Sequence, residues 1–260
     1  MTPEESTARY LAAVDQVLPG FVDMLFLTGS VALGAFQPGV SDIDTVIVTS
    51  RSPGPADLAE LAAVHATLPE RPHFDGIYLD RQQFTQQPVD RPVVPHVVNG
   101  QFRTDQPCGD LNPVLWLTLS RYGRSVRGPA VAELGLTVDV DELRQQTLDN
   151  LKRYWAREIR QALHGVPDDV AADATTVDAE AIVWRVLGPA RLHYTLAHGD
   201  VITKAGAAAY LAEHFPAYAS LADRAVRWRQ GEPITFTVAD ARAVADSIDA
   251  VVADAWHRWG

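Results

Sequence analysis

The chain contains little sulfur and almost no lysine. Its 260 residues include one cysteine, Cys108, two methionines and two lysines, Lys152 and Lys204. A single cysteine excludes an internal disulfide framework, and it is typical of proteins in a reducing cytoplasm. No apolar run approaches the roughly 18 residues that a membrane span requires, and the first residues lack the pattern of a secretory signal. We therefore expect a cytoplasmic protein without a membrane partner.

Basic residues are outnumbered by acidic ones. There are 22 lysines and arginines against 33 aspartates and glutamates, which gives a formal net charge of −11. Proteins that bind along nucleic acids neutralise phosphates with clustered basic side chains, so this balance argues against a nucleic-acid partner. A cationic small molecule is easier to accommodate on such a surface.

The first third of the chain alternates helical and strand patterns. Apolar and β-branched segments predict strands over 22–28, 45–49 and 72–79, and the sequence Thr2-Pro3-Glu4-Glu5 predicts a helix start. Further helices are expected over 31–35 and 56–68. These patterns predict an α/β domain with a small mixed sheet and flanking helices, over residues 1–108.

The rest of the chain reads as helical. Residues 81–110 are rich in Gln, Pro, Asp and Gly, with short strand-like pieces, and helices are expected from Asn112 onwards. The longer ones are predicted over 139–164, 178–198, 203–214, 217–229 and 238–258. We therefore expect an all-α helical bundle over residues 109–260.

A short motif in the first domain carries the chemistry. Gly29-Ser30 follows a strand and opens a short helix, and Asp42 and Asp44 come after eleven intervening residues. Residues two apart on a strand point to the same face, so the two carboxylates lie side by side, an arrangement that a hard cation such as Mg²⁺ stabilises. Gly29 permits close approach to a phosphate, to which the Ser30 hydroxyl can hydrogen-bond. The alternative is that Asp42 caps a turn and Asp44 lies on an exposed edge.

This spacing resembles the motif of the nucleotidyltransferase superfamily of DNA polymerase β type. The resemblance implies transfer of a nucleoside monophosphate from a nucleoside triphosphate, with two Mg²⁺ ions held by Asp42 and Asp44. Members of the superfamily use a third carboxylate from a neighbouring strand. Asp75 is our candidate for it, as general base or as metal ligand, and Asp80 at the end of the same strand is its competitor.

The second half is similar to the helical domain of the aminoglycoside 3″-adenylyltransferases, the streptomycin and spectinomycin resistance enzymes. The likeness lies in the segment from Val186 to Leu196, which includes Gly188-Pro189, and in Ile202-Thr203-Lys204. It implies ATP as co-substrate, an aminoglycoside or aminocyclitol as acceptor in a cleft between the domains, and contact of Lys204 with the nucleotide phosphates. The sequence departs from the family in carrying aspartate rather than glutamate at position 75.

Other functions remain open at this stage. The acidic stretch 167–180 can pair with the cationic groups of an antibiotic or can be a solvated loop. The spacing of Arg157 and His164 on one helix is found in proteins whose nucleotidyltransferase acts on a protein or RNA acceptor. A non-catalytic nucleotide-binding module is the third alternative. Which acceptor and which hydroxyl react, and the oligomeric state, are not encoded in these patterns.

Overall fold

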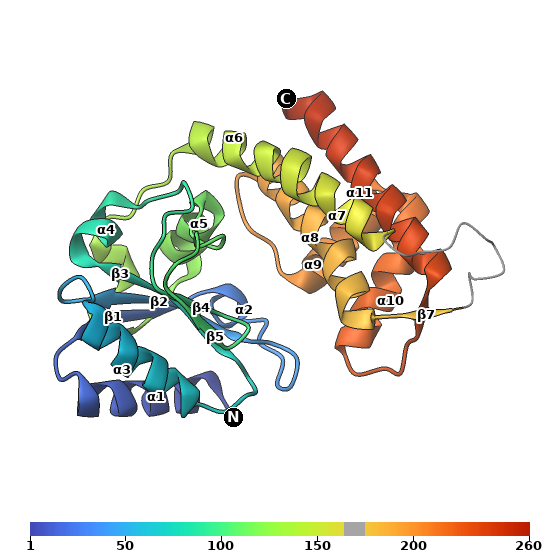
Figure 1. Cartoon of the computed structure of the whole chain (residues 1–260). Helices are drawn as coiled ribbons and strands as arrows, with labels where there is room; N and C mark the ends of the chain where they lie inside the picture. The colour runs from blue at the N-terminus through green and yellow to red at the C-terminus, as the bar shows by residue number, and fades with distance from the viewer. Residues whose placement is uncertain (164–174) are drawn as a thin grey trace. The chain divides into compact units, whose positions relative to one another are not determined.

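The chain folds as two compact units. A computed structural model describes residues 1–163 and 175–260, and its contacts divide the chain into Met1–Asp139 and Val140–Gly260. Figure 1 draws both units, coloured along the chain. The first unit is an α/β domain and the second is helical, as the sequence predicts.

The division between the units lies later than the predicted boundary at residue 108. Residues 109–139 belong to the first unit because two of their elements pack on its sheet. The helix α5 (Pro113–Tyr122) supplies buried Trp116 and Leu119 to a core on the sheet. The strand β6 (Arg124–Arg127) then pairs antiparallel with β1 (Val22–Leu27), where the sequence pattern from Asn112 onwards predicts only helix.

The first unit is built on a six-stranded mixed sheet with the strand order β5-β4-β3-β2-β1-β6. Only β2 and β3 run parallel, and the other neighbours are antiparallel. The remaining strands are β2 (Ile43–Thr49), β3 (Phe74–Asp80), β4 (His96–Val98) and β5 (Gln101–Arg103). Its other helical elements are α1 (Pro3–Val17), α2 (Gly29–Ala32), α3 (Pro55–Ala66), α4 (Arg81–Gln86) and the 3₁₀ turn η1 (Val131–Leu134).

Helices cover both faces of this sheet, as Figure 1 shows. Because strand side chains alternate between faces, Ile43 and Ile47 of β2 pack with α1 and α3, whereas Val46 and Val48 pack with α4 and α5. Burial on both faces explains why β2 and β3 are almost continuously apolar. A carboxylate in either strand therefore lies next to an apolar core.

A buried histidine makes the first unit sensitive to acid. His65 of α3 lies 2.7 Å from the Tyr78 hydroxyl, and burial lowers its pKa from 6.5 to about 4. Between pH 4 and pH 6.5 the unfolded chain binds more protons at this histidine than the folded chain does. The neutral His65 therefore makes its full contribution to the unfolding free energy above pH 6.5, and this contribution is lost as the pH falls toward 4. By pH 5 the loss is roughly 2 kcal/mol.

We expect His65→Phe to flatten this part of the pH dependence. Urea unfolding at pH 7 and pH 5 would show a drop in unfolding free energy that is smaller by about 2 kcal/mol in the variant. Equal drops in the two proteins would contradict the assignment to His65.

The second unit packs its helices around one apolar core. The core joins Val183 and Leu187 of α8 (Ala179–His198) to Val244 and Ile248 of α11 (Val238–Trp259). Buried His193 lies within hydrogen-bond distance of Tyr210 and Asp254, and so links α8 to two further helices.

The other elements of the second unit are α6 (Val140–Asn150), the π-helical turn η2 (Leu151–Trp155), α7 (Ala156–Ala162), β7 (Thr176–Val177), α9 (Lys204–His214), the 3₁₀ turn η4 (Pro216–Tyr218), α10 (Ala219–Arg229) and β8 (Phe236–Thr237). No helix among residues 1–163 and 175–260 is long and apolar enough to cross a membrane.

Gly188 in α8 is required by the packing of Trp155. A Cβ at this position would lie 2.2 Å from Cη2 of the Trp155 ring. We expect Gly188→Ala to destabilise the protein by about 1–2 kcal/mol in urea unfolding, since overpacking outweighs the gain in helix propensity. Trp155→Phe removes the clashing ring atoms, so the double variant should lose less than the two single losses added together. Additive losses would place the strain elsewhere.

Candidate active site

Two of the predicted carboxylates are neighbours across the parallel strands. Asp44 of β2 is in register with Asp75 of β3. Asp44 points to the same face of the sheet as Val46 and Val48, and Asp75 to the same face as Ile77 and Leu79. These four apolar side chains pack in the core on the α5 side. Both carboxylates therefore belong to the α5 face of the sheet, where β2 and β3 begin.

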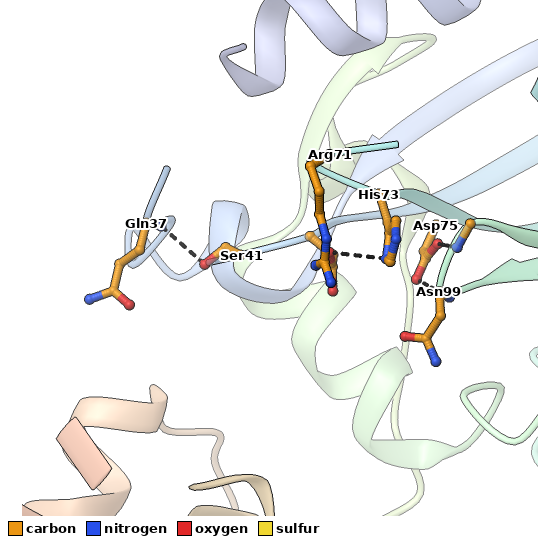
Figure 2. Close-up of polar contacts among 8 residues, drawn as sticks. Gln37, Ser41, Arg71, His73, Asp75 and Asn99 are labelled. Carbon is orange, nitrogen blue, oxygen red and sulfur yellow. Dashed lines mark hydrogen bonds and ion pairs between the residues drawn. The ribbon is translucent and has the colours of Figure 1, made fainter. Parts of the chain in front are cut away.

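A histidine that the sequence analysis did not select completes a cluster at this edge. Ligand atoms of Asp42, His73 and Asp75 all lie within 4.8 Å of one another, and the His73 Nδ1 atom is 3.4 Å from Asp42 Oδ1. Figure 2 shows the His73 ring next to Asp75. Its signal was present in the sequence, because His73 precedes Asp75 by two residues as Asp42 precedes Asp44.

Asp42 is held by its own loop and by an arginine. The Ser41 hydroxyl accepts a hydrogen bond from the Gln37 amide at 3.0 Å, and the Ser41 amide donates to the Gln37 carbonyl at 2.9 Å. These bonds, the first of which is drawn in Figure 2, close the turn that leads into Asp42. The Arg71 guanidinium lies 3.2 Å from the same Asp42 oxygen that faces His73.

Asp75 is held by the tip of a β-hairpin. Asn99 and Gly100 join β4 to β5, both with positive φ (50° and 70°), as a two-residue type I′ turn requires. The Asn99 amide donates to Asp75 Oδ2 at 2.8 Å and the Gly100 amide to Oδ1 at 3.0 Å. In the sequence, Asn99-Gly100 lies in the Gln-, Pro- and Gly-rich region 81–110, where only short strand-like pieces are expected, although Asn-Gly is a strong hairpin signal.

The surroundings of Asp75 make it a stronger base than an exposed aspartate. Burial raises its pKa above the ordinary value, and the negative charge of Asp42 acts in the same direction. The amides of Gly100 and Asn99 and the nearby His73 act in the opposite direction and do not cancel the effect of burial. A raised pKa favours a carboxylate as a proton acceptor in catalysis.

Gly29 lies directly against the carboxylate of Asp44. The Thr28 amide donates to the Asp44 carbonyl at 2.9 Å, which brings the start of α2 beside β2. Gly29 has φ of +53°, and a Cβ built on it would lie 1.9 Å from Asp44 Oδ2. Glycine is therefore required here both by backbone conformation and by space.

Ser30 presents a buried hydroxyl without a partner. Among the residues that the structure describes, no group hydrogen-bonds to its Oγ atom. A buried polar atom of this kind usually has a partner, and a phosphate oxygen would supply one. The Gly29-Ser30 turn and the oxygen and nitrogen donors of Asp42, Asp75 and His73 thus fit a nucleotide phosphate with a divalent cation.

Asp80 and Lys204, two other predicted residues, belong to other elements. Asp80 ends β3 as the N-cap of α4 and accepts a hydrogen bond from the Gln83 amide at 2.8 Å, which is a structural role. Lys204 is the first residue of α9 in the second unit, after the N-cap Thr203. His164 and residues 167–174 of the acidic stretch lie outside the described residues.

Comparison with known proteins identifies the first unit. Residues 9–87 match the family model of the nucleotidyltransferase domain, and this segment contains Gly29, Asp42, Asp44 and Asp75. The chain contains a nucleotidyltransferase domain. A search of curated protein sequences finds no relative.

The fold of nearly the whole chain matches that of a known enzyme structure. It matches the crystal structure of spectinomycin adenyltransferase AAD(9) from Enterococcus faecialis with ATP and spectinomycin, with a TM-score of 0.70. The match covers 96% of this chain and 98% of that one, at 15% sequence identity. At this identity the match establishes a shared fold across both units.

Proposed function

We propose that this nucleotidyltransferase moves AMP from ATP to a hydroxyl of a cationic aminoglycoside or aminocyclitol of the streptomycin and spectinomycin type. The observation that carries the proposal is the cluster of Asp42, His73 and Asp75 in the nucleotidyltransferase domain. The unpartnered Ser30 hydroxyl beside it supports a phosphate ligand.

The side chains have distinct parts in this reaction. Asp42 and Asp44 would hold divalent cations, which neutralise charge on the triphosphate and lower the pKa of a bound hydroxyl when they are present. Ser30 would bind a phosphate oxygen, and Lys204 would contribute a positive charge to the phosphates. Asp75 would accept the proton of the acceptor hydroxyl, or bind a cation next to it.

The chemical step is a displacement at the α-phosphorus. The acceptor oxygen forms a bond to that phosphorus while the bond to the bridging oxygen of the β-phosphate breaks. Pyrophosphate leaves with the electron pair, and the hydroxyl proton passes to a base, which we propose is Asp75. The two amides at the hairpin tip that bind its carboxylate, and its raised pKa, support this choice.

Two observations favour a small cationic acceptor. The matched enzyme structure was determined with ATP and spectinomycin. The net charge of −11 favours an amine- or guanidine-bearing substrate over a polyanion.

Mass spectrometry of the acceptor tests the proposal. Streptomycin, spectinomycin and other aminoglycosides are incubated with the protein, ATP and either Mg²⁺ or Mn²⁺, and one or more should gain an AMP group with release of pyrophosphate. Asp44→Asn is the control and should form no adduct. Pyrophosphate release with an RNA or protein acceptor, and with no antibiotic, would overturn the choice of acceptor. Full activity of Asp44→Asn would overturn the role of that carboxylate in cation binding.

A further inference from the structure

His73 has the position of a metal ligand. It lies immediately before β3, and its Nδ1 atom points to Asp42 Oδ1 at 3.4 Å, within the same cluster as Asp75. We propose that His73 Nδ1 binds the divalent cation together with Asp42 and Asp75, and that this nitrogen ligand makes the site prefer Mn²⁺ to Mg²⁺. The inference deepens the proposed function, since it concerns the cation of the same site.

The Nδ1 atom of His73 has no hydrogen-bond partner in the described parts of the chain. The side chain is only 14% exposed, the Nδ1 atom itself is buried, and it makes no hydrogen bond there. The 3.4 Å contact with Asp42 is close enough for an ion pair but does not have hydrogen-bond geometry. A buried ring nitrogen is costly unless something binds it, and a cation between His73 and the two carboxylates would do so.

The backbone around His73 fixes the ring where a ligand is needed. Its carbonyl accepts a hydrogen bond from the Ile43 amide at 2.9 Å, which extends the β2–β3 pairing by one residue. Gly100 at the hairpin tip packs against the ring, since a Cβ there would lie 3.3 Å from His73 Cδ2. The same turn that binds Asp75 therefore also supports the imidazole.

Arg71 provides the competing explanation. Its guanidinium lies 3.2 Å from the Asp42 oxygen that faces His73, so arginine and histidine together can act as plain counter-charges of Asp42. The Arg71 side chain is 52% exposed, however, and an exposed ion pair of this kind is weak and free to rearrange. It can give way to a divalent ion, which the carboxylates bind more strongly.

The chemistry of the ligand set leads to the choice of metal. Mg²⁺ prefers oxygen ligands, whereas imidazole suits ions of the first transition series, and Mn²⁺ accepts both carboxylates and imidazole. Two aspartates and one histidine therefore favour Mn²⁺ over Mg²⁺ at this position. The preference should depend on the nitrogen and not on the charge of the cluster.

Pulsed electron paramagnetic resonance of bound Mn²⁺ tests the ligand directly. We expect electron spin echo modulation from a histidine ¹⁴N in the wild-type protein, and its replacement by a ¹⁵N pattern when histidine is isotopically labelled. Because this measurement uses the unaltered chain, it does not depend on the folding of a variant. Mn²⁺ bound without histidine modulation would overturn the proposal.

Two substitutions and a matched control test the preference. His73→Leu removes the ligand and should weaken Mn²⁺ binding by tenfold or more while changing Mg²⁺ binding less. His73→Asn can place an amide oxygen near the position of Nδ1 and should lower the ratio of Mn²⁺ to Mg²⁺ affinity. His257→Asn changes an exposed histidine of α11 and should leave both affinities unchanged. Wild-type affinities in His73→Leu would favour the counter-charge explanation.

These outcomes are separate from the fate of the proposed function. If Mn²⁺ shows the histidine signal but no acceptor gains AMP with either metal, the ligand assignment stands and the proposed reaction fails. If adducts form and the signal is absent, the reaction stands and His73 is not a ligand.

Discussion

Asp75→Asn is expected to lower the rate of AMP transfer by about 10²- to 10⁴-fold, because it removes a carboxylate that either accepts the proton of the acceptor hydroxyl or binds the cation that activates it. The substitution keeps the shape of the side chain but removes its charge and its basicity. It also places an NH₂ group against one of the two amides of Asn99 and Gly100 that now donate to the carboxylate. Steady-state rates of adduct formation with a saturating acceptor would measure the effect.

The loss should be chemical and not a failure to fold. Burial already disfavours the charged form of Asp75, as its raised pKa indicates, which offsets part of the cost of the lost hydrogen bond, so the free energy of unfolding should fall by no more than about 1–2 kcal/mol. Asp80→Asn is the matched control on the same strand. Asparagine is also a good N-cap, so this variant should keep both the start of α4 and the activity. Equal activity losses in the two variants would remove the special role of Asp75.

Gly29→Ala is the second substitution with a large expected effect. The new methyl group would need the space of Asp44 Oδ2, 1.9 Å away, so the carboxylate has to move. A displacement of about 1 Å at a reacting centre can lower the rate by roughly 100-fold. Alanine at a φ of +53° also costs about 1–2 kcal/mol in stability. Adduct formation and urea unfolding measure the two losses.

Gly34→Ala separates the two causes. Gly34 follows α2 with a φ of +66°, but a Cβ there meets nothing within 4 Å. This variant should lose a similar backbone contribution to stability and keep its activity. If it lost activity as Gly29→Ala does, the contact with Asp44 would not be the reason for the glycine.

The sequence predicts the fold well where periodicity and caps agree. The alternation of strands and helices up to residue 80 follows directly from apolar periods and from the Thr2-Glu5 capping box. The edge strand β6 was missed because its residues, Arg-Ser-Val-Arg, are exposed and resemble the end of a helix. Only pairing with β1, a tertiary effect, makes that segment a strand and moves the domain boundary to residue 139.

The candidate site was predicted where residues lie close in sequence. Asp42 and Asp44 follow from the spacing of one strand, and Asp75 from the expectation of an acid on the next. The register that sets Asp44 beside Asp75, and the hairpin amides that bind Asp75, depend on pairings between distant segments. The predicted metal pair was Asp42 with Asp44, and among the described residues the three-residue ligand cluster joins Asp42 to Asp75 and His73 instead. The role of Asp44 as a metal ligand stays a prediction.

The hairpin tip at Asn99 and Gly100 has a consequence for the choice of insertion sites in this chain. An exposed two-residue turn is ordinarily a place where a peptide tag or a longer loop is tolerated. Here both exposed turn residues give their amides to Asp75, and Gly100 supports the His73 ring. One inserted residue would change the turn type and withdraw both donors at once. Although this turn is exposed, an insertion there is thus expected to disrupt the site as much as an insertion into the core would.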